Sequence, residues 1–314
     1  MKLGGLLARS SVMCELFDEI RRYAHADATV LVTGETGTGK DAVAHALHHA
    51  GPRRHHPYVK IDCPSLPHNL VESELFGHER GAFTDAATAR AGRFEIAGRG
   101  TVYIDNVNEL AIDAQAKLLR LVEEKHAERL GGTVSYPLQA RVIASADANL
   151  EAAVRDGAFR EDLYHRLRVL PLRIPPLRDR PADIQPLARA FLRESGARHG
   201  RPRLRLATDA ASALERHTWP GNVRELKHTI ERAVLSLDTD RDELRAQDLP
   251  PDLFEDVGHL YAPDATGRPT LDEVERRYIE LTLRQTKDNQ GEAARILGIS
   301  RKALWEKRKR YGLR

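Results

Sequence analysis

Cysteine, aromatic residues and long apolar runs are all scarce in this chain of 314 residues. Its two cysteines, Cys14 and Cys63, are too few for a disulfide framework, and neither stands in a Cys-x-x-Cys pair. No run approaches the roughly 18 consecutive apolar residues of a membrane-spanning helix, and the first residues have no signal-peptide core. These absences argue against a disulfide-rich secreted domain and against a membrane partner, and they predict a cytoplasmic protein.

What the chain does contain is enough apolar surface for folded cores, with 41% hydrophobic and 30% charged residues. At roughly 150 residues per domain, its length predicts two or three domains. Positive charge is concentrated at the C-terminal end. Residues 295–314 carry eight Lys or Arg and one acidic residue, a net charge of +7, so the first 294 residues carry −4. An acidic body with a basic end predicts a separate nucleic-acid-binding module.

The first half of the chain alternates short β-rich runs with helical stretches, which predicts a parallel α/β sheet. We expect strands at residues 28–33, 58–62, 101–105, 141–145 and 169–174, with helices such as 41–49 and 113–124 between them. After a proline-rich stretch, helical patterns at 184–199, 207–217 and 222–237 predict a small helical subdomain. Residues 246–268 have the composition of a linker, and a last helical unit begins at Leu271.

A glycine-rich loop follows the first predicted strand and leads directly into a helix. Such a loop curls its backbone N–H groups around phosphates, the helix N-terminus adds its dipole, and the lysine reaches the β- and γ-phosphates. This context predicts an ATP site, and the residues expected to bind the nucleotide are Gly34, Glu35, Thr36, Gly37, Thr38, Gly39, Lys40 and Asp41. Asp41 stands where the general motif has Ser or Thr.

The second part of a nucleotide site is an apolar strand that ends in a carboxylate on the magnesium side. Residues 101–105 provide this strand, so we expect Asp105 to hold Mg²⁺ directly or through water. In ATPases of this kind the next residue is usually a Glu that orients the attacking water, and here it is Asn106. An amide can position water but cannot accept its proton, which argues against fast hydrolysis.

Together with the segment 72–86, these motifs resemble the bacterial enhancer-binding proteins, the AAA+ ATPases that activate sigma-54 RNA polymerase. The segment reads ESELFGHERGAFTDA and is similar to the family's ELFGHEKGAFTGA, in which the GAFTGA loop touches sigma-54. The resemblance extends from about Leu6 to the C-terminus, and it implies that Phe83 and Thr84 contact sigma-54. Asp85 replaces the second glycine of the family's loop.

Two more motifs follow in family order. FREDLYHRL at 159–167 is similar to FREDLYYRL, whose arginines reach a neighbouring subunit's nucleotide, so the resemblance implies this role for Arg160 and Arg166. A planar, permanently charged guanidinium stabilises charge on transferring phosphoryl oxygens. WPGNVREL at 219–226 matches the sensor II segment and implies that Arg224 reads the γ-phosphate. Arginines that act in trans require a face-to-tail assembly, and the resemblance implies a hexameric ring.

Two further positions depart from the family pattern. Asp62 stands where a switch Asn is common, and Asp147 replaces the Asn of sensor I. Together with Asn106, these residues redistribute carboxylates and amides around the γ-phosphate. One hypothesis is that the carboxylate has moved from position 106 to Asp62. The other is that hydrolysis is slow or absent.

The last helical unit has the signature of a helix-turn-helix. Residues 290–313 read QGEAARILGISRKALWEKRKRYGL, in which Gly298 sits in the turn and Ser300 can cap the next helix. The pattern is similar to the Fis-type domain of the same family and predicts dimeric recognition of a palindromic site. Trp305 is expected, like Trp219, to be a core anchor. We expect the cations of the second helix to stay exposed, and the residues expected at the DNA are Ser300, Arg301, Lys302, Lys307, Arg308 and Arg310.

The predicted organisation is an AAA+ α/β ATPase core at 1–174, a helical lid at 175–245, a linker at 246–270 and a Fis-type helix-turn-helix domain at 271–314. The leading interpretation is an activator that binds enhancer DNA and uses ATP and Mg²⁺ to remodel sigma-54 RNA polymerase. The alternative, favoured by Asn106 and Asp85, is a nucleotide-gated DNA-binding regulator with little or no turnover. Most family members carry an N-terminal regulatory domain, commonly a two-component receiver, so we expect either a shortened chain or a separate regulator.

Overall fold

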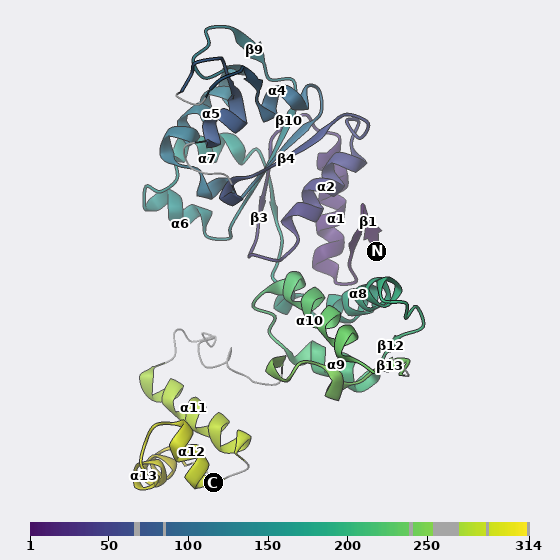
Figure 1. Ribbon diagram of the computed structural model, residues 1–314, viewed down its shortest axis with the longest axis vertical. Helices are drawn as coiled ribbons and strands as arrows, with labels where there is room; N and C mark the ends of the chain where they lie inside the picture. Colours follow the sequence, from purple (N-terminus) through teal and green to yellow (C-terminus); the bar gives the residue numbers. More distant parts are fainter. Residues whose placement is uncertain (66–69, 84–85, 239–240, 254–269, 287–288, 313–314) are drawn as a thin grey trace. The chain divides into compact units, whose positions relative to one another are not determined.

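The computed structural model describes residues 1–65, 70–83, 86–238, 241–253, 270–286 and 289–312, which form two compact units, Met1–Ala246 and Gln247–Arg314. The first unit contains the sheet, its covering helices and a helical subdomain (Figure 1). The second contains the three C-terminal helices. None of the described helices is long and apolar enough to cross a membrane.

Five parallel strands form the central sheet, in the order β11-β3-β10-β7-β4. Their bounds are β3 Val30–Thr33, β4 Tyr58–Asp62, β7 Thr101–Asp105, β10 Arg141–Ala146 and β11 Leu170–Arg173. The central strands are near-continuous apolar runs because helices cover both faces of a parallel sheet. The predicted α/β fold with a parallel sheet is confirmed, and all five strands begin and end within two residues of the predicted bounds.

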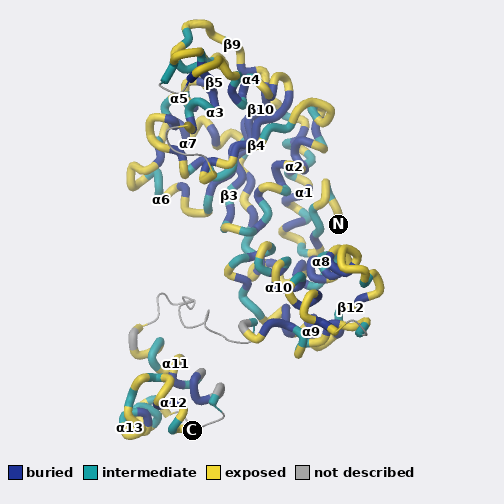
Figure 2. The backbone as a smooth tube through the Cα atoms, in the orientation of Figure 1, coloured by how far each residue is buried: buried dark blue, intermediate teal, exposed yellow. Residues whose placement is uncertain are grey.

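Helices cover the two faces of this sheet, and the buried residues lie along it (Figures 1 and 2). On one face α1 (Ser11–Ala24) and α2 (Lys40–Ala50) pack against Val30 and Val32. On the other face α5 (Ile112–Glu124) and α7 (Glu161–Leu167) pack in one cluster with Leu31, since alternate residues of a strand point to opposite faces. Shorter elements complete this part: α3 Val71–Phe76, α4 Arg93–Ala97, α6 Leu150–Arg155, and the strand pairs β1 Lys2–Leu3 with β2 Leu6–Leu7, β5 Gly77–His78 with β6 Arg90–Ala91, and β8 His126–Glu128 with β9 Ser135–Pro137.

The helical subdomain follows the last strand of the sheet. It consists of α8 Ile184–Arg198, α9 Thr208–Arg216 and α10 Asn222–Ser236, with a short parallel pair, β12 Arg205–Leu206 and β13 Glu243–Leu244. Trp219 is fully buried and donates its indole N–H to the Leu214 carbonyl at 2.9 Å. The prediction that Trp219 anchors a core is therefore confirmed.

The second unit packs α11 (Leu271–Gln285), α12 (Gln290–Ile296) and α13 (Arg301–Tyr311) around a core of Ile279, Leu283, Ala293, Ala294 and Leu304. Ser300 caps α13 as predicted, because its hydroxyl accepts the Ala303 N–H at 3.1 Å. Trp305, in contrast, is 56% exposed, so its prediction as a core residue is wrong. This small core takes Leu304 from α13, and the next residue lies about 100° further round the helix.

Candidate functional site

A cavity of about 660 Å³ lies at the carboxyl edge of the sheet, where the loop after β3 meets α2. The loop has left-handed backbone at two glycines, with φ of 81° at Gly37 and 106° at Gly39. Because α2 begins at Lys40, its first N–H groups point toward the loop. Residues 36–41 line the cavity, so the structure places most of the predicted phosphate-binding residues on one wall.

Lys40 is buried and folded back onto its own loop. Its Nζ donates to the Gly34 carbonyl at 2.7 Å and lies 3.1 Å from Asp147 Oδ1. Asp147 directly follows β10, at the same edge of the sheet, which is why this predicted residue meets the lysine. A phosphate oxygen placed in the cavity would compete with these two acceptors for the ammonium.

Asp105 is held by three donors at the end of β7. Its carboxylate accepts hydrogen bonds from the Tyr103 hydroxyl at 2.8 Å and the Ser145 hydroxyl at 2.6 Å, and it lies 3.0 Å from Lys60 Nζ. Burial alone would raise the pKa of Asp105, but these donors outweigh burial and hold the pKa below its ordinary value. The group is therefore an ionised carboxylate at neutral pH, as a cation site requires.

Lys60 links Asp105 to the glycine-rich loop. Its ammonium also lies 2.8 Å from Asp41, so two carboxylates share one cation. Burial lowers the pKa of Lys60, but the two carboxylates raise it by more. Lys60 is not among the residues predicted from the sequence, although a signal exists: it lies two positions before Asp62, and alternate residues of a strand share a face.

Asn106 lines the cavity beside Asp105, whereas Asp62 does not. Asn106 has a left-handed backbone, with φ of 55°, and its N–H donates to Ser145 Oγ at 3.0 Å. Asp62 is exposed at the end of β4, where it pairs in register with Asp105. The Asn106 amide therefore lies on the cavity wall. The Asp62 carboxylate, which one hypothesis assigns the role of the usual Glu, lies outside the cavity.

The helical subdomain closes on the loop through Asn222, the first residue of α10. Asn222 is fully buried, and its amide donates to Glu35 Oε2 and to the Thr36 carbonyl, each at 3.1 Å. Its side-chain oxygen accepts the Leu177 N–H at 2.7 Å. Glu35 also forms two hydrogen bonds with Arg178, at 2.5 and 2.8 Å. Glu35, predicted to bind nucleotide, therefore holds the subdomain to the loop and does not line the cavity.

Three arginines that follow the sheet in the chain, Arg180, Arg198 and Arg224, line the same cavity. Arg224 was expected from its motif, and its backbone N–H donates to the Gly37 carbonyl at 3.3 Å. Arg180 was not expected. It is 3% exposed, and its Nη2 donates to the Thr38 carbonyl at 3.0 Å. A Cβ at Gly37 would lie 2.3 Å from the Gly221 carbonyl oxygen, so only glycine allows the loop and the subdomain to touch here.

The predicted trans-acting arginines and Phe83 do not line this cavity. Arg160 pairs with Asp162 at 2.7 Å, Arg166 is exposed on α7, and neither arginine lines the cavity. Phe83 packs edge-on against His78, with ring centroids 5.0 Å apart. Thr84, the second predicted sigma-54 contact, lies outside the described residues.

In the C-terminal unit, two of the predicted DNA contacts are engaged with α11. Lys307 Nζ lies 2.6 Å from Glu275, and an Arg310 guanidinium nitrogen lies 3.1 Å from Asp272. The expectation that Lys307 is exposed is wrong, because it is half-buried against α11. These two cations already have carboxylate partners.

The remaining predicted cations of α13 divide by exposure. Arg301 and Lys302, at the start of the helix, are exposed. Arg308 is half-buried, contrary to expectation. Lys309 is exposed and was not among the predicted DNA contacts.

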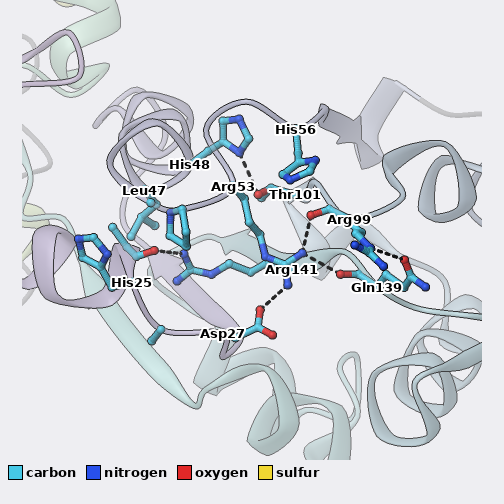
Figure 3. Close-up of a pocket in the computed structure, with 14 residues that line it drawn as sticks. His25, Asp27, Leu47, His48, Arg53, His56, Arg99, Thr101, Gln139 and Arg141 are labelled. Atoms are coloured by element: carbon cyan, nitrogen blue, oxygen red, sulfur yellow. Dashed lines mark hydrogen bonds and ion pairs between the residues drawn. The ribbon is translucent and has the colours of Figure 1, made fainter.

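A second cavity, of about 500 Å³, lies at the opposite end of the strands, beside the start of β10 (Figure 3). Arg53 and Arg141 reach into it, but both guanidinium groups already have acceptors. Arg53 donates to Asp27 and to three main-chain carbonyls, and Arg141 donates to the carbonyls of Tyr23 and Ala24. We interpret these arginines as links between chain segments, and not as a ligand site.

Three family models match the chain. The Sigma-54 interaction domain matches residues 6–173, the AAA+ ATPase lid domain matches 178–263, and the bacterial regulatory protein, Fis family, matches 270–311.

Curated relatives and solved structures match over nearly all of the chain. Regulatory protein AtoC of Escherichia coli (strain K12) is 40% identical over 316 residues, which cover 99% of this chain and 68% of that protein. The Nif-specific regulatory protein of Azotobacter vinelandii is 43% identical over 309 residues, covering 94% of this chain and 56% of that protein. The chain thus spans between about half and two thirds of these relatives. Crystal structures of NtrX from Brucella abortus with ADP and with ATP have TM-scores of 0.73 and 0.72 at 30% identity, covering 98% and 99% of this chain and 70% of the matched chain.

Proposed function

The chain belongs to the sigma-54-dependent transcriptional activators, and on that premise we propose that it binds ATP in the cavity beside Lys40 and Asp105 and uses it to remodel sigma-54 RNA polymerase. One observation carries the proposal. A phosphate-type loop, its lysine and a neighbouring carboxylate surround a single cavity, and a second subdomain closes on the same loop. The structural neighbour NtrX is described in complex with ADP and with ATP, which supports a nucleotide as the ligand.

Phosphate binding uses groups that are already in place. The phosphates replace the Gly34 carbonyl and Asp147 as partners of Lys40, and the loop N–H groups add donors. Arg224, which belongs to the helical subdomain and lines the cavity, adds a positive charge that attracts the phosphates. Arg160 and Arg166 come from a neighbouring copy in a face-to-tail ring, a hexamer by family resemblance.

Two carboxylates, Asp105 at the end of β7 and Asp41 at the start of α2, also fit Mg²⁺. Carboxylate oxygens are ligands that Mg²⁺ prefers in proteins, and Asp105 and Asp41 already share the ammonium of Lys60. We propose that Asp105 holds the ion. When bound, the ion would neutralise charge on the phosphate oxygens. Lys60 would stay paired with Asp41.

Asn106 favours a second candidate function. Its amide can hold the attacking water in place, but it cannot take the proton. A protein that binds ATP without fast turnover is a nucleotide-gated DNA-binding regulator. Both candidates share the same nucleotide site and differ only in the rate of hydrolysis.

The proposed partners follow from the other motifs. The C-terminal unit binds enhancer DNA as a dimer on a palindromic site, and Phe83 and Thr84 contact sigma-54. The domain boundaries proposed from the sequence agree with this assignment, because they separate a DNA-binding domain that starts at Leu271 from the ATPase core that carries the sigma-54 contacts. The signal reaches the ATPase through a regulatory domain or a separate regulator.

Steady-state phosphate release, with and without enhancer DNA, separates the two candidates. Lys40→Ala should abolish nucleotide binding because the loop loses its only lysine, while DNA binding should persist because it belongs to the other unit. Thr84→Ala should keep the ATPase and lose open-complex formation at a sigma-54 promoter. Unchanged ATP affinity in Lys40→Ala contradicts the proposed site.

A further inference from the structure

We propose that Trp305 reads DNA sequence by packing its indole against a thymine methyl group in the major groove. The inference rests on the proposed function, since it assumes that the C-terminal unit binds duplex DNA. Its starting point is the difference between the chain's two tryptophans. Trp219 is fully buried, whereas Trp305 is 56% exposed on a helix rich in cations.

The packing of α13 fixes which of its faces points outward. Leu304 is fully buried in the core, and both Lys307 Nζ and the Tyr311 hydroxyl lie 2.6 Å from the Glu275 carboxylate of α11. These three residues of α13 have the spacing i, i+3 and i+7, so they form one helix face. That face is occupied by α11, and Trp305 lies beside it on the outward side.

The outward side carries a stripe formed by Arg301, Trp305 and Lys309, which are four residues apart and all exposed. Lys309 Nζ lies over the indole, 5.5 Å from the ring centroid. Lys302 is exposed one helical turn before Trp305. The indole is therefore flanked by three cations on the exposed side of the helix, where Glu306 is the one acidic residue of α13.

This combination favours duplex DNA over a second copy of the chain as the occupant. Phosphates pair with the flanking cations, and the apolar edge of a base can pack on the indole. Two copies meeting through this stripe would place like charges against each other. Trp305 is also the fifth residue of α13, in the N-terminal part of a recognition helix that contacts base edges.

The chemistry of the groove identifies the base. In the major groove each base pair presents its own pattern of donors and acceptors, and thymine alone adds a methyl group. An indole edge offers apolar surface for that methyl. The expected preference is therefore for thymine at one position of each half-site.

The test removes the methyl from the DNA and the indole from the protein. The probe is the duplex that the full chain selects from a random-sequence library, with each thymine replaced in turn by deoxyuridine, which lacks only the methyl. We expect one replacement per half-site to weaken binding of the wild-type chain about fourfold. The same replacement should leave the DNA affinity of Trp305→Gln unchanged and should weaken that of Trp305→Phe by less than in wild type. This pattern measures the coupling between the side chain at position 305 and the thymine methyl.

Two readouts separate the possible failures. Tryptophan fluorescence of the full chain should lose its accessibility to acrylamide when the duplex binds, with Trp219 as the internal buried reference. If every replacement affects wild type and Trp305→Gln equally, the proposed contact is wrong. If Trp305→Gln instead lowers the oligomeric state in sedimentation, the indole joins two copies, which also overturns the proposal. Failure of the wild-type chain to select any duplex contradicts the DNA-binding function itself.

Discussion

At the scale of single residues, the proposed hydrolysis depends on the group beside Asp105. Asn106 lines the cavity next to Asp105, and an amide cannot accept a proton from water. Asp62 is exposed and does not line the cavity. This placement favours loss of the proton acceptor over its transfer to Asp62.

We therefore expect Asn106→Glu to raise steady-state phosphate release by at least about tenfold, because a positioned general base contributes on the order of 10²-fold or more. The left-handed backbone at residue 106 costs Glu about 1 kcal/mol of folded-state stability, so the rate is measured well below the Tm of the variant. Asp62→Asn serves as the control and should leave turnover unchanged. If Asp62→Asn abolishes turnover and Asn106→Glu weakens ATP binding, the carboxylate has moved and two like charges now repel each other.

If Asp105 holds Mg²⁺ as proposed, Lys60 competes with the ion for this carboxylate. In Lys60→Met the carboxylates of Asp41 and Asp105 lose their shared cation, so we expect a lower Tm without metal and severalfold tighter Mg²⁺ binding. A titration of Tm with Mg²⁺, without nucleotide, measures both effects. Lys117→Met, which removes a lysine paired with Glu72, is the matched control and should show neither. If Mg²⁺ shifts the Tm of Lys60→Met and of wild type at the same concentrations, Lys60 does not compete with the ion for Asp105.

The site residues that the sequence predicts well are those fixed by one loop or one strand end. Lys40 and Asp105 follow from local patterns, because a glycine-rich turn and an apolar strand define their positions. Arg180 could not be found this way, since it meets Thr38 across 142 positions of the chain. Trp305 was misplaced for a related reason: which side of α13 faces the core depends on how α11 packs.

At the scale of elements, the contact between the loop after β3 and α10 is the main joint of the first unit. Asn222 forms this joint with a left-handed backbone, at φ of 53°, and with hydrogen bonds to Glu35, Thr36 and Leu177. The strands themselves were predictable because each is a buried apolar run. The joint was not, because it connects residues 187 positions apart.

We expect Asn222→Gly to lower the free energy of unfolding of the first unit by about 1–3 kcal/mol and to weaken ATP binding. Glycine keeps the left-handed backbone, so the loss reports the buried partners that the side chain leaves unsatisfied. Arg178→Gln is the control, because it removes only a half-exposed partner of Glu35 and should cost less than about 1 kcal/mol. Equal losses in the two variants, measured by denaturant unfolding, contradict the importance of the joint.

At the scale of the whole molecule, one chain does not contain a complete proposed catalytic site. The cavity has the loop, Lys40 and Asp105, but Arg160 and Arg166 do not line it. Arg160 is half-buried and paired with Asp162, and Arg166 is exposed on α7. If these arginines act on a nucleotide, they act on that of another copy.

Mixing variants tests this arrangement. Arg160→Ala and Lys40→Ala should each abolish turnover alone, and an equal mixture should recover up to about a quarter of wild-type turnover, because a random ring pairs an intact loop with an intact arginine at one interface in four. The control mixes Lys40→Ala with Asp105→Asn. Both changes lie on the loop side of the cavity, so no interface is complete and no activity should return. Recovery in the control mixture, or none with Arg160→Ala at any ratio, rules out the action of Arg160 in trans.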